Sequence, residues 1–189
     1  MFKLKVITVV GNKPMELNIR NENDHRIPFI KIALKQRLIS FIDEGLEWVI
    51  MSGQMGIELW AAQVIAELKE EYPIKLGIFP PFLEYESRWP DVYQETFLQI
   101  IEQADFYQPL YNETYKAPYQ FINKDVWFIE KTDGCLALVD EEYPGSVMYI
   151  LDKMKKAAET SNYSIWYITP NDLEDIVRDQ QEYNESHLD

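Results

Sequence analysis

Short apolar runs alternate with longer amphipathic segments along most of this chain. The runs are nearly continuous and rich in β-branched residues, which is typical of strands buried on both faces of a parallel sheet. We expect such strands over residues 3–10, 46–52, 74–80, 104–108, 134–140 and 164–169. The segments between them carry apolar residues at three- and four-residue spacing, which indicates helices. These helices are expected over 28–45, 56–72, 88–103, 118–132, 146–160 and 171–182.

The alternation of strands and helices predicts an α/β fold. We expect a three-layer sandwich in which a mainly parallel sheet of about six strands carries helices on both faces. The 189 residues are typical of one domain, which we place over 1–182, and the acidic tail over 183–189 is expected to be disordered. A polar, tyrosine-rich segment over 109–120 predicts a long loop, either a connector or a lid over a site.

The chain carries 32 acidic against 18 basic residues, a formal net charge of −14. A broad interface with the phosphates of double-stranded DNA requires a basic surface, so this class of partner is not expected. A few backbone amides and one lysine are enough, however, to hold a small anion. The net charge therefore does not exclude a nucleotide ligand. It does not exclude a protein partner or oligomer formation either.

Cysteine and histidine are too scarce for several kinds of site. Cys135 lies in an apolar run, where a small buried side chain is the expected role, and a single cysteine forms no disulfide within its chain. His25 lies in a polar loop and His187 in the tail, so we expect no metal site. The N-terminal run lacks the features of a signal peptide, and no apolar stretch is long enough to span a bilayer. We therefore expect a soluble cytoplasmic protein without a membrane partner.

Turns that contain glycine follow three of the expected strands. Ligands of an open parallel sheet bind beyond the carboxyl ends of its strands, where neighbouring crossovers diverge, and the backbone amides at a helix start bind anions there. Each turn taken alone is also explained by a tight strand–helix connection or by helix capping. The candidate ligand-binding residues in these turns are Gly11, Lys13, Pro14, Ser52, Gly53, Gln54, Gly56, Pro144, Gly145 and Ser146.

Glu58 is the unusual member of this set, because it places a carboxylate in the first helical turn after a glycine turn. It either complements the helix dipole or meets a ligand, as an acceptor for ribose hydroxyls or as a base. Any general acid or base chemistry would fall to Glu58, Asp140 or a neighbouring acid. Trp60, Phe82 and Trp89 are candidates for stacking on a base, although core or rim packing is the commoner role of such aromatic residues.

Three stretches of the sequence resemble the YpsA-like proteins of Gram-positive bacteria, and the resemblance covers nearly the whole chain. These stretches are "VVGNKPMEL", "GLEWVIMSGQMGIELWAA" and "KTDGCLALVDEEYPGS". The YpsA-like family is placed in the SMF/DprA/LOG superfamily, which includes DNA-processing protein A and the lonely-guy phosphoribohydrolases. The resemblance implies a Rossmann-like fold and a nucleotide or nucleotide-derived ligand of the ADP-ribose kind. The YpsA-like group has also been tied to bacterial cell division.

The motifs of the superfamily are only partly present. "SGQMGIELWAA" is similar to the SG-x-A-x-GID-x-x-AH stretch of the DNA-processing branch, with Glu58 in place of its aspartate and no histidine after Ala62. "PGS" over 144–146 stands where lonely-guy proteins carry PGG-x-GT-x-x-E, and neither the threonine nor the glutamate of that motif is present. The missing glutamate argues against phosphoribohydrolase activity.

Three functions therefore remain open. We favour a protein that binds or senses a nucleotide or an ADP-ribose-like compound, with the glycine turns around phosphate or ribose and Glu58 on the ribose hydroxyls. The first alternative is an enzyme that cleaves the N-glycosidic bond of a nucleotide with Glu58 or Asp140. The second is a protein-interaction adaptor in which the turns are structural. We expect no cofactor besides such a nucleotide-like ligand.

Overall fold

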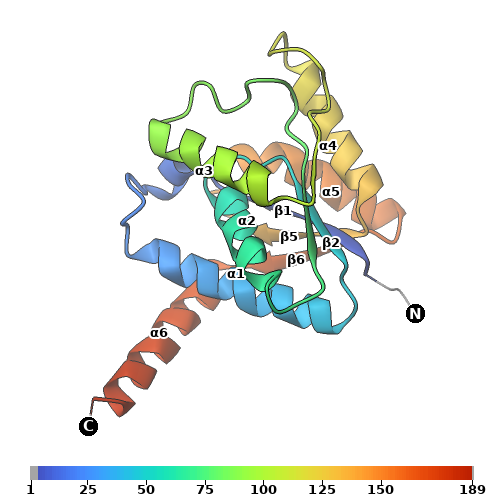
Figure 1. Ribbon diagram of the computed structural model, residues 1–189. Coiled ribbons are helices and arrows are strands. Elements are labelled where there is room, and N and C mark those ends of the chain that lie inside the picture. Colours follow the sequence, from blue (N-terminus) through green and yellow to red (C-terminus); the bar gives the residue numbers. More distant parts are fainter. Residues whose placement is uncertain (1–3, 189) are drawn as a thin grey trace.

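A six-stranded sheet runs through the centre of the molecule (Figure 1). The computed structural model describes residues 4–188. The strands are β1 (Val6–Gly11), β2 (Trp48–Met51), β3 (Lys75–Ile78), β4 (Phe106–Tyr107), β5 (Gly134–Leu138) and β6 (Ser164–Ile168). They lie in the order β4-β3-β2-β1-β5-β6, and each neighbouring pair is parallel. The predicted α/β fold with a parallel sheet is confirmed.

The helices that connect the strands also lie where the spacing of apolar residues predicts them. They are α1 (Arg26–Asp43), α2 (Ile57–Leu68), α3 (Asp91–Gln103), α4 (Tyr119–Lys131), α5 (Met148–Thr160) and α6 (Pro170–Ser186), with short 3-10 helices η1 (Pro14–Leu17) and η2 (Gly145–Val147). Helix α6 extends away from the body of the molecule (Figure 1), and residues 183–186 of the expected tail form its last turn. Among residues 4–188, no helix combines the length and the apolar character needed to cross a membrane.

The sheet separates two layers of helices, and the side chains of its central strand β1 pack against both layers. Successive side chains of a strand point to opposite faces, and Ile7 and Val9 pack in a core cluster with α1, α2 and α3. Val10 points the other way and packs in a second cluster with apolar side chains of β5 and α5. Helix α4 packs beside α5, whereas α6 packs against α1. The sheet is therefore covered on both faces, as in a three-layer sandwich.

The order of the strands places a crevice at the end of β1. The chain leaves β1 for α1 on one face and leaves β5, the neighbour of β1, for α5 on the other face. Crossovers that diverge in this way leave a crevice at the carboxyl ends of the two strands. Asn12 Nδ2 donates a hydrogen bond of 2.9 Å to the Pro144 carbonyl across this point. The glycine turn after β1 and the glycine turn after β5 are thus side by side, because β5 lies next to β1.

The long segment before α4 runs alongside the chain that leaves β3. The Leu110 amide donates to the Pro80 carbonyl, and the Leu83 amide donates to the Glu113 carbonyl, both at 2.9 Å. The buried Gln120 side chain accepts a hydrogen bond from the Lys116 amide at 2.6 Å. These bonds hold the segment at the carboxyl ends of the strands, near the crevice. Whether the segment is a connector or a lid stays a prediction.

Candidate ligand-binding site

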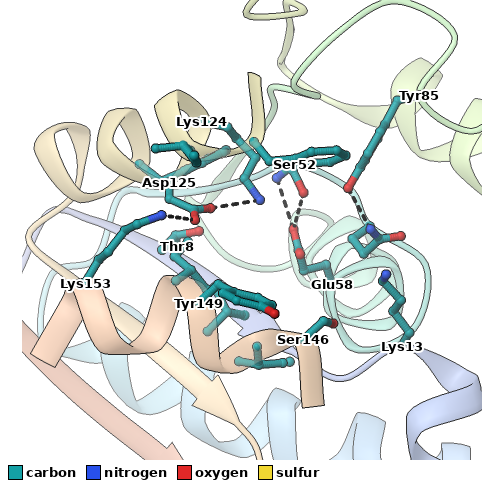
Figure 2. A pocket seen from close by; sticks show the side chains of 18 of the residues that line it. Thr8, Lys13, Ser52, Glu58, Tyr85, Lys124, Asp125, Ser146, Tyr149 and Lys153 are labelled. Atoms are coloured by element: carbon teal, nitrogen blue, oxygen red, sulfur yellow. Dashed lines mark hydrogen bonds and ion pairs between the residues drawn. The ribbon is translucent and has the colours of Figure 1, made fainter. Parts of the chain in front are cut away.

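A cavity of about 440 Å³ opens at the carboxyl ends of β1 and β2, between the sheet and helices α4 and α5. It lies at the point where the crossovers diverge, and its volume is in the range of small-molecule sites. Apolar residues of α4 and α5 form part of its walls. Its polar lining, shown in part in Figure 2, consists of Thr8, Lys13, Ser52, Gln54, Glu58, Tyr85, Lys124, Asp125, Ser146, Tyr149 and Lys153.

Glu58 is anchored through one of its two carboxylate oxygens. Glu58 Oε1 accepts hydrogen bonds from the Ser52 amide at 3.1 Å, from Ser52 Oγ at 2.9 Å and from the Gly53 amide at 3.3 Å. Burial raises the pKa of Glu58 above its ordinary value, although the Lys124 charge and these hydrogen bonds act in the opposite direction. Within residues 4–188 no group donates a hydrogen bond to Oε2. This second oxygen is therefore available to a ligand in the cavity.

A second glutamate occupies the turn that opens η2 and α5. Glu16, in η1, accepts hydrogen bonds from the Ser146 amide at 2.6 Å and from Ser146 Oγ at 2.9 Å. It also accepts a hydrogen bond of 2.9 Å from the Lys13 amide. Burial works to raise the pKa of Glu16, but the hydrogen bonds from Ser146 and Lys13 outweigh it, and the pKa is lowered. Glu16 thus joins the turn after β1 to the turn after β5.

Two lysines and an aspartate form an ion-pair cluster on the wall made by α4 and α5. Asp125 Oδ1 lies 3.1 Å from Lys124 Nζ, and Asp125 Oδ2 accepts a hydrogen bond of 2.8 Å from Lys153 Nζ. The Asp125 side chain is 7% exposed, whereas those of Lys124 and Lys153 are 15% and 33% exposed. Figure 2 shows this cluster across the cavity from Lys13. The cavity therefore has cationic groups on opposite sides.

A second cavity of about 570 Å³ adjoins the first and is lined by aromatic rings. The two cavities share Lys13, Gln54, Tyr85 and Phe121 in their linings. At the boundary, Gln54 Nε2 donates a hydrogen bond of 2.8 Å to the Tyr85 hydroxyl, and burial raises the pKa of Tyr85. The aromatic residues that line the second cavity are Phe82, Tyr85, Trp89, Tyr115 and Phe121.

Comparison with known proteins identifies the family of this chain. The model of the YspA SLOG family, also written YpsA, matches residues 7–173. The chain belongs to this family. It is 52% identical over 176 residues to a UPF0398 protein of Oceanobacillus iheyensis, with 93% of this chain and 95% of the relative covered. It is 46% identical over 179 residues to a UPF0398 protein of Bacillus cereus, with coverage of 94% and 97%.

This SLOG-family protein brings about half of the predicted site residues together at the main cavity. Those that line it are Gly11, Lys13, Ser52, Gln54, Glu58 and Ser146. Phe82 and Trp89 line the aromatic cavity instead, together with Lys13 and Gln54. Trp60 is fully buried in the core, so its ring packs against the fold and does not meet a ligand. Asp140 is outside both linings, and its Oδ1 accepts a hydrogen bond of 2.9 Å from the Glu142 amide.

The remaining predicted residues of the SLOG-family site shape the turns. Gly53 has φ +83°, and a Cβ added there would lie 2.7 Å from the Phe97 ring. Pro144 accepts the hydrogen bond from Asn12. Pro14 is buried at the start of η1. Gly56 and Gly145 also have positive φ, and all five lie outside the lining of both cavities.

Several residues of the site were not predicted from the sequence. Lys124, Asp125 and Lys153 belong to this group, as do Thr8 and Tyr85. A signal for Asp125 is present in the helical spacing, because it falls between Phe121 and Phe128 on the apolar stripe of α4. A charged residue on such a stripe is buried only when it is paired, which makes it a marker for a polar site.

The raised pKa of Glu58 predicts an unusual dependence of stability on pH. Between the ordinary pKa of 4.5 and the higher folded-state value, the folded protein binds more protons than the unfolded chain. The stability that Glu58 contributes is therefore present below pH 4.5 and is lost as the pH rises through the folded pKa. We expect the Glu58→Gln variant to gain unfolding free energy relative to the wild type over this range, as measured by urea unfolding at a series of pH values.

The Glu16→Gln variant should show the opposite dependence of stability on pH, because the pKa of Glu16 in the folded protein is lowered, whereas that of Glu58 is raised. Its stabilising contribution is present above the ordinary pKa of 4.5 and is lost as the pH falls through the folded pKa. The Glu16→Gln variant should therefore be less stable than the wild type at neutral pH, with a difference that shrinks in acid. If the unfolding free energies of the two variants changed in the same direction relative to the wild type, the opposite pKa shifts of Glu58 and Glu16 would be contradicted.

Proposed function

We propose that this protein binds a nucleotide or a nucleotide-derived ligand, such as an ADP-ribose-like compound, in the cavity between β1, α4 and α5. The observation that supports this most is Glu58, which is held by the turn through Oε1 and leaves Oε2 to the cavity. A carboxylate oxygen in this position is a suitable acceptor for the vicinal hydroxyls of ribose. Binding is expected to use this oxygen as the anchor for the sugar.

The two cavities offer a counterpart for each part of a nucleotide. Lysine ammonium groups suit a phosphate, the Glu58 carboxylate suits the ribose hydroxyls, and the rings of the second cavity suit a base. Gln54 and Tyr85 line both cavities, so the two spaces are neighbours. The combined space supports a ligand that is larger than a single phosphate or sugar.

Cleavage of an N-glycosidic bond is the second candidate function, and one observation favours it. Burial raises the pKa of Glu58, and a raised pKa makes a carboxyl group better suited to act as a general acid or base. Asp140, the other candidate acid, lies outside the cavity and caps a turn. Such an enzyme would therefore depend on Glu58 as its general acid or base.

A calorimetric titration tests the proposal. The purified protein is titrated with nucleoside monophosphates, nucleoside diphosphates, NAD and ADP-ribose, and we expect at least one of these compounds to bind below millimolar concentration. The same mixtures are then analysed by chromatography for free base, whose release would favour the hydrolase over the binding protein. Absence of binding at millimolar concentration would contradict the proposal and would favour the adaptor.

A further inference from the structure

Two of the three glycine turns that were candidate phosphate sites already bind a carboxylate of the chain. In the first, the amides of Ser52 and Gly53 and the Ser52 hydroxyl all donate to Glu58. In the other, the amide and hydroxyl of Ser146 donate to Glu16. A phosphate would have to displace an anchored carboxylate to reach these donors. The anionic part of a ligand therefore requires other groups.

The ion-pair cluster of Lys124, Asp125 and Lys153 supplies such groups. Each lysine directs its ammonium nitrogen to a different oxygen of Asp125, at 3.1 Å and 2.8 Å. An ammonium group has three N–H donors, so one bond to Asp125 fixes its position and leaves donors for a ligand. Because Asp125 is buried, it holds both ammonium groups against the cavity wall. The cluster is thus an arrangement of cations prepared before a ligand arrives.

The charge of the cavity differs in sign from that of the whole chain. Three lysines and two carboxylates line it, namely Lys13, Lys124, Lys153, Glu58 and Asp125. With all five ionised the cavity carries one positive charge, although the chain has a formal net charge of −14. A local positive charge in an acidic protein concentrates small anions at that point.

We propose that Lys124 and Lys153, held in place by Asp125, form the phosphate-binding subsite of the cavity. This inference deepens the proposed function and rests on it for the sugar, which lies at Glu58 when the phosphate occupies the subsite. It also fixes the direction of the ligand. The phosphate lies at the wall formed by α4 and α5, and the base extends toward the aromatic cavity.

Inorganic pyrophosphate is a probe that isolates this subsite, because it has neither sugar nor base. We titrate pyrophosphate into ¹⁵N-labelled protein and follow the backbone amide signals by NMR in the wild type and in the Lys124→Met and Lys153→Met variants. Each variant should bind pyrophosphate about tenfold more weakly or worse, as expected for the loss of one charge-assisted hydrogen bond. Lys155→Met is the matched control, because Lys155 is on the same helix α5 as Lys153 and pairs with the exposed Glu141. It should change the affinity less than twofold.

A measurement on the wild-type protein covers the case in which a lysine variant fails to fold. Trace acetylation of lysines, read out by peptide mass spectrometry, is performed with and without pyrophosphate. Pyrophosphate should protect Lys124 and Lys153 several-fold while the labelling of Lys155 stays unchanged. Equal protection of all three lysines, or no protection of the first two, would overturn the subsite.

The outcomes separate this inference from the proposed function. Pyrophosphate binding that depends on the two lysines, in a protein that binds no nucleotide, supports the subsite and contradicts the proposed function. Nucleotide binding that weakens in Glu58→Gln and is unchanged in Lys124→Met and Lys153→Met supports the proposed function and overturns the subsite. Absence of pyrophosphate binding to the wild type also overturns it.

Discussion

The Glu58→Gln variant is expected to fold like the wild type and to bind its nucleotide-derived ligand about ten- to a hundred-fold more weakly. Glutamine keeps an oxygen in the place of Oε1, so the hydrogen bonds from Ser52 and Gly53 are retained. It replaces Oε2 with an NH₂ group, which cannot accept hydrogen bonds from ribose hydroxyls. The loss of a charge-assisted acceptor corresponds to about 1.5 to 3 kcal/mol of binding free energy. Calorimetric titration measures it.

Glu67→Gln is the control for this change. Glu67 lies on the same helix α2, and its side chain is exposed at the far end of the helix from the cavity. Its substitution removes the same charge from the molecule and should leave the affinity within about twofold of that of the wild type. A loss of thermal stability in Glu58→Gln with unchanged affinity would restrict Glu58 to a structural role.

The Gly56→Ala variant should lose about 3 kcal/mol or more of unfolding free energy. Gly56 has φ +96° and ψ −130° at the start of α2, a conformation that alanine adopts only with strain. A Cβ would also lie 2.5 Å from the Asn12 carbonyl oxygen. That oxygen accepts the hydrogen bond of the Ile57 amide, so the backbone has little freedom to move away. Urea unfolding followed by circular dichroism measures the change.

The Gly45→Ala variant is the comparison for Gly56→Ala, because it tests a positive φ without the contact between the added Cβ and the Asn12 carbonyl oxygen. Gly45 also has a positive φ, of +108°, and lies part-exposed just after α1. Its substitution should cost about 1 to 2 kcal/mol, which is the cost of the left-handed conformation alone. Equal losses in the two variants would show that the contact with Asn12 adds nothing at Gly56.

The arrangement of strands and helices was predictable because each element carries its own periodicity. The apolar run of β1 reads as a strand without knowledge of its neighbours, and the spacing of Leu34, Leu38 and Phe41 indicates α1 in the same way. The place of the cavity followed from a general property of parallel sheets. Glu58 was found because a carboxylate stands out in a stretch that is otherwise apolar.

The chemistry on the cavity wall was not predictable in the same way, because it depends on how α4 packs against α5. Asp125 and Lys153 are 28 residues apart in the sequence and meet only in the folded protein. Glu16 and Ser146, 130 residues apart, likewise meet only because β5 lies beside β1. The sequences of the turns after β2 and β5 suggested donors free for a phosphate, whereas the donors of Ser52, Gly53 and Ser146 bind glutamates of the chain.

A crystal structure of the protein with the tightest-binding compound of the nucleotide panel tests the central claim most directly. We predict that the compound lies in the cavity between β1, α4 and α5, with a ribose hydroxyl within hydrogen-bond distance of Glu58 Oε2. A compound bound elsewhere on the molecule, or one in the cavity whose ribose does not contact Glu58, would contradict the claim.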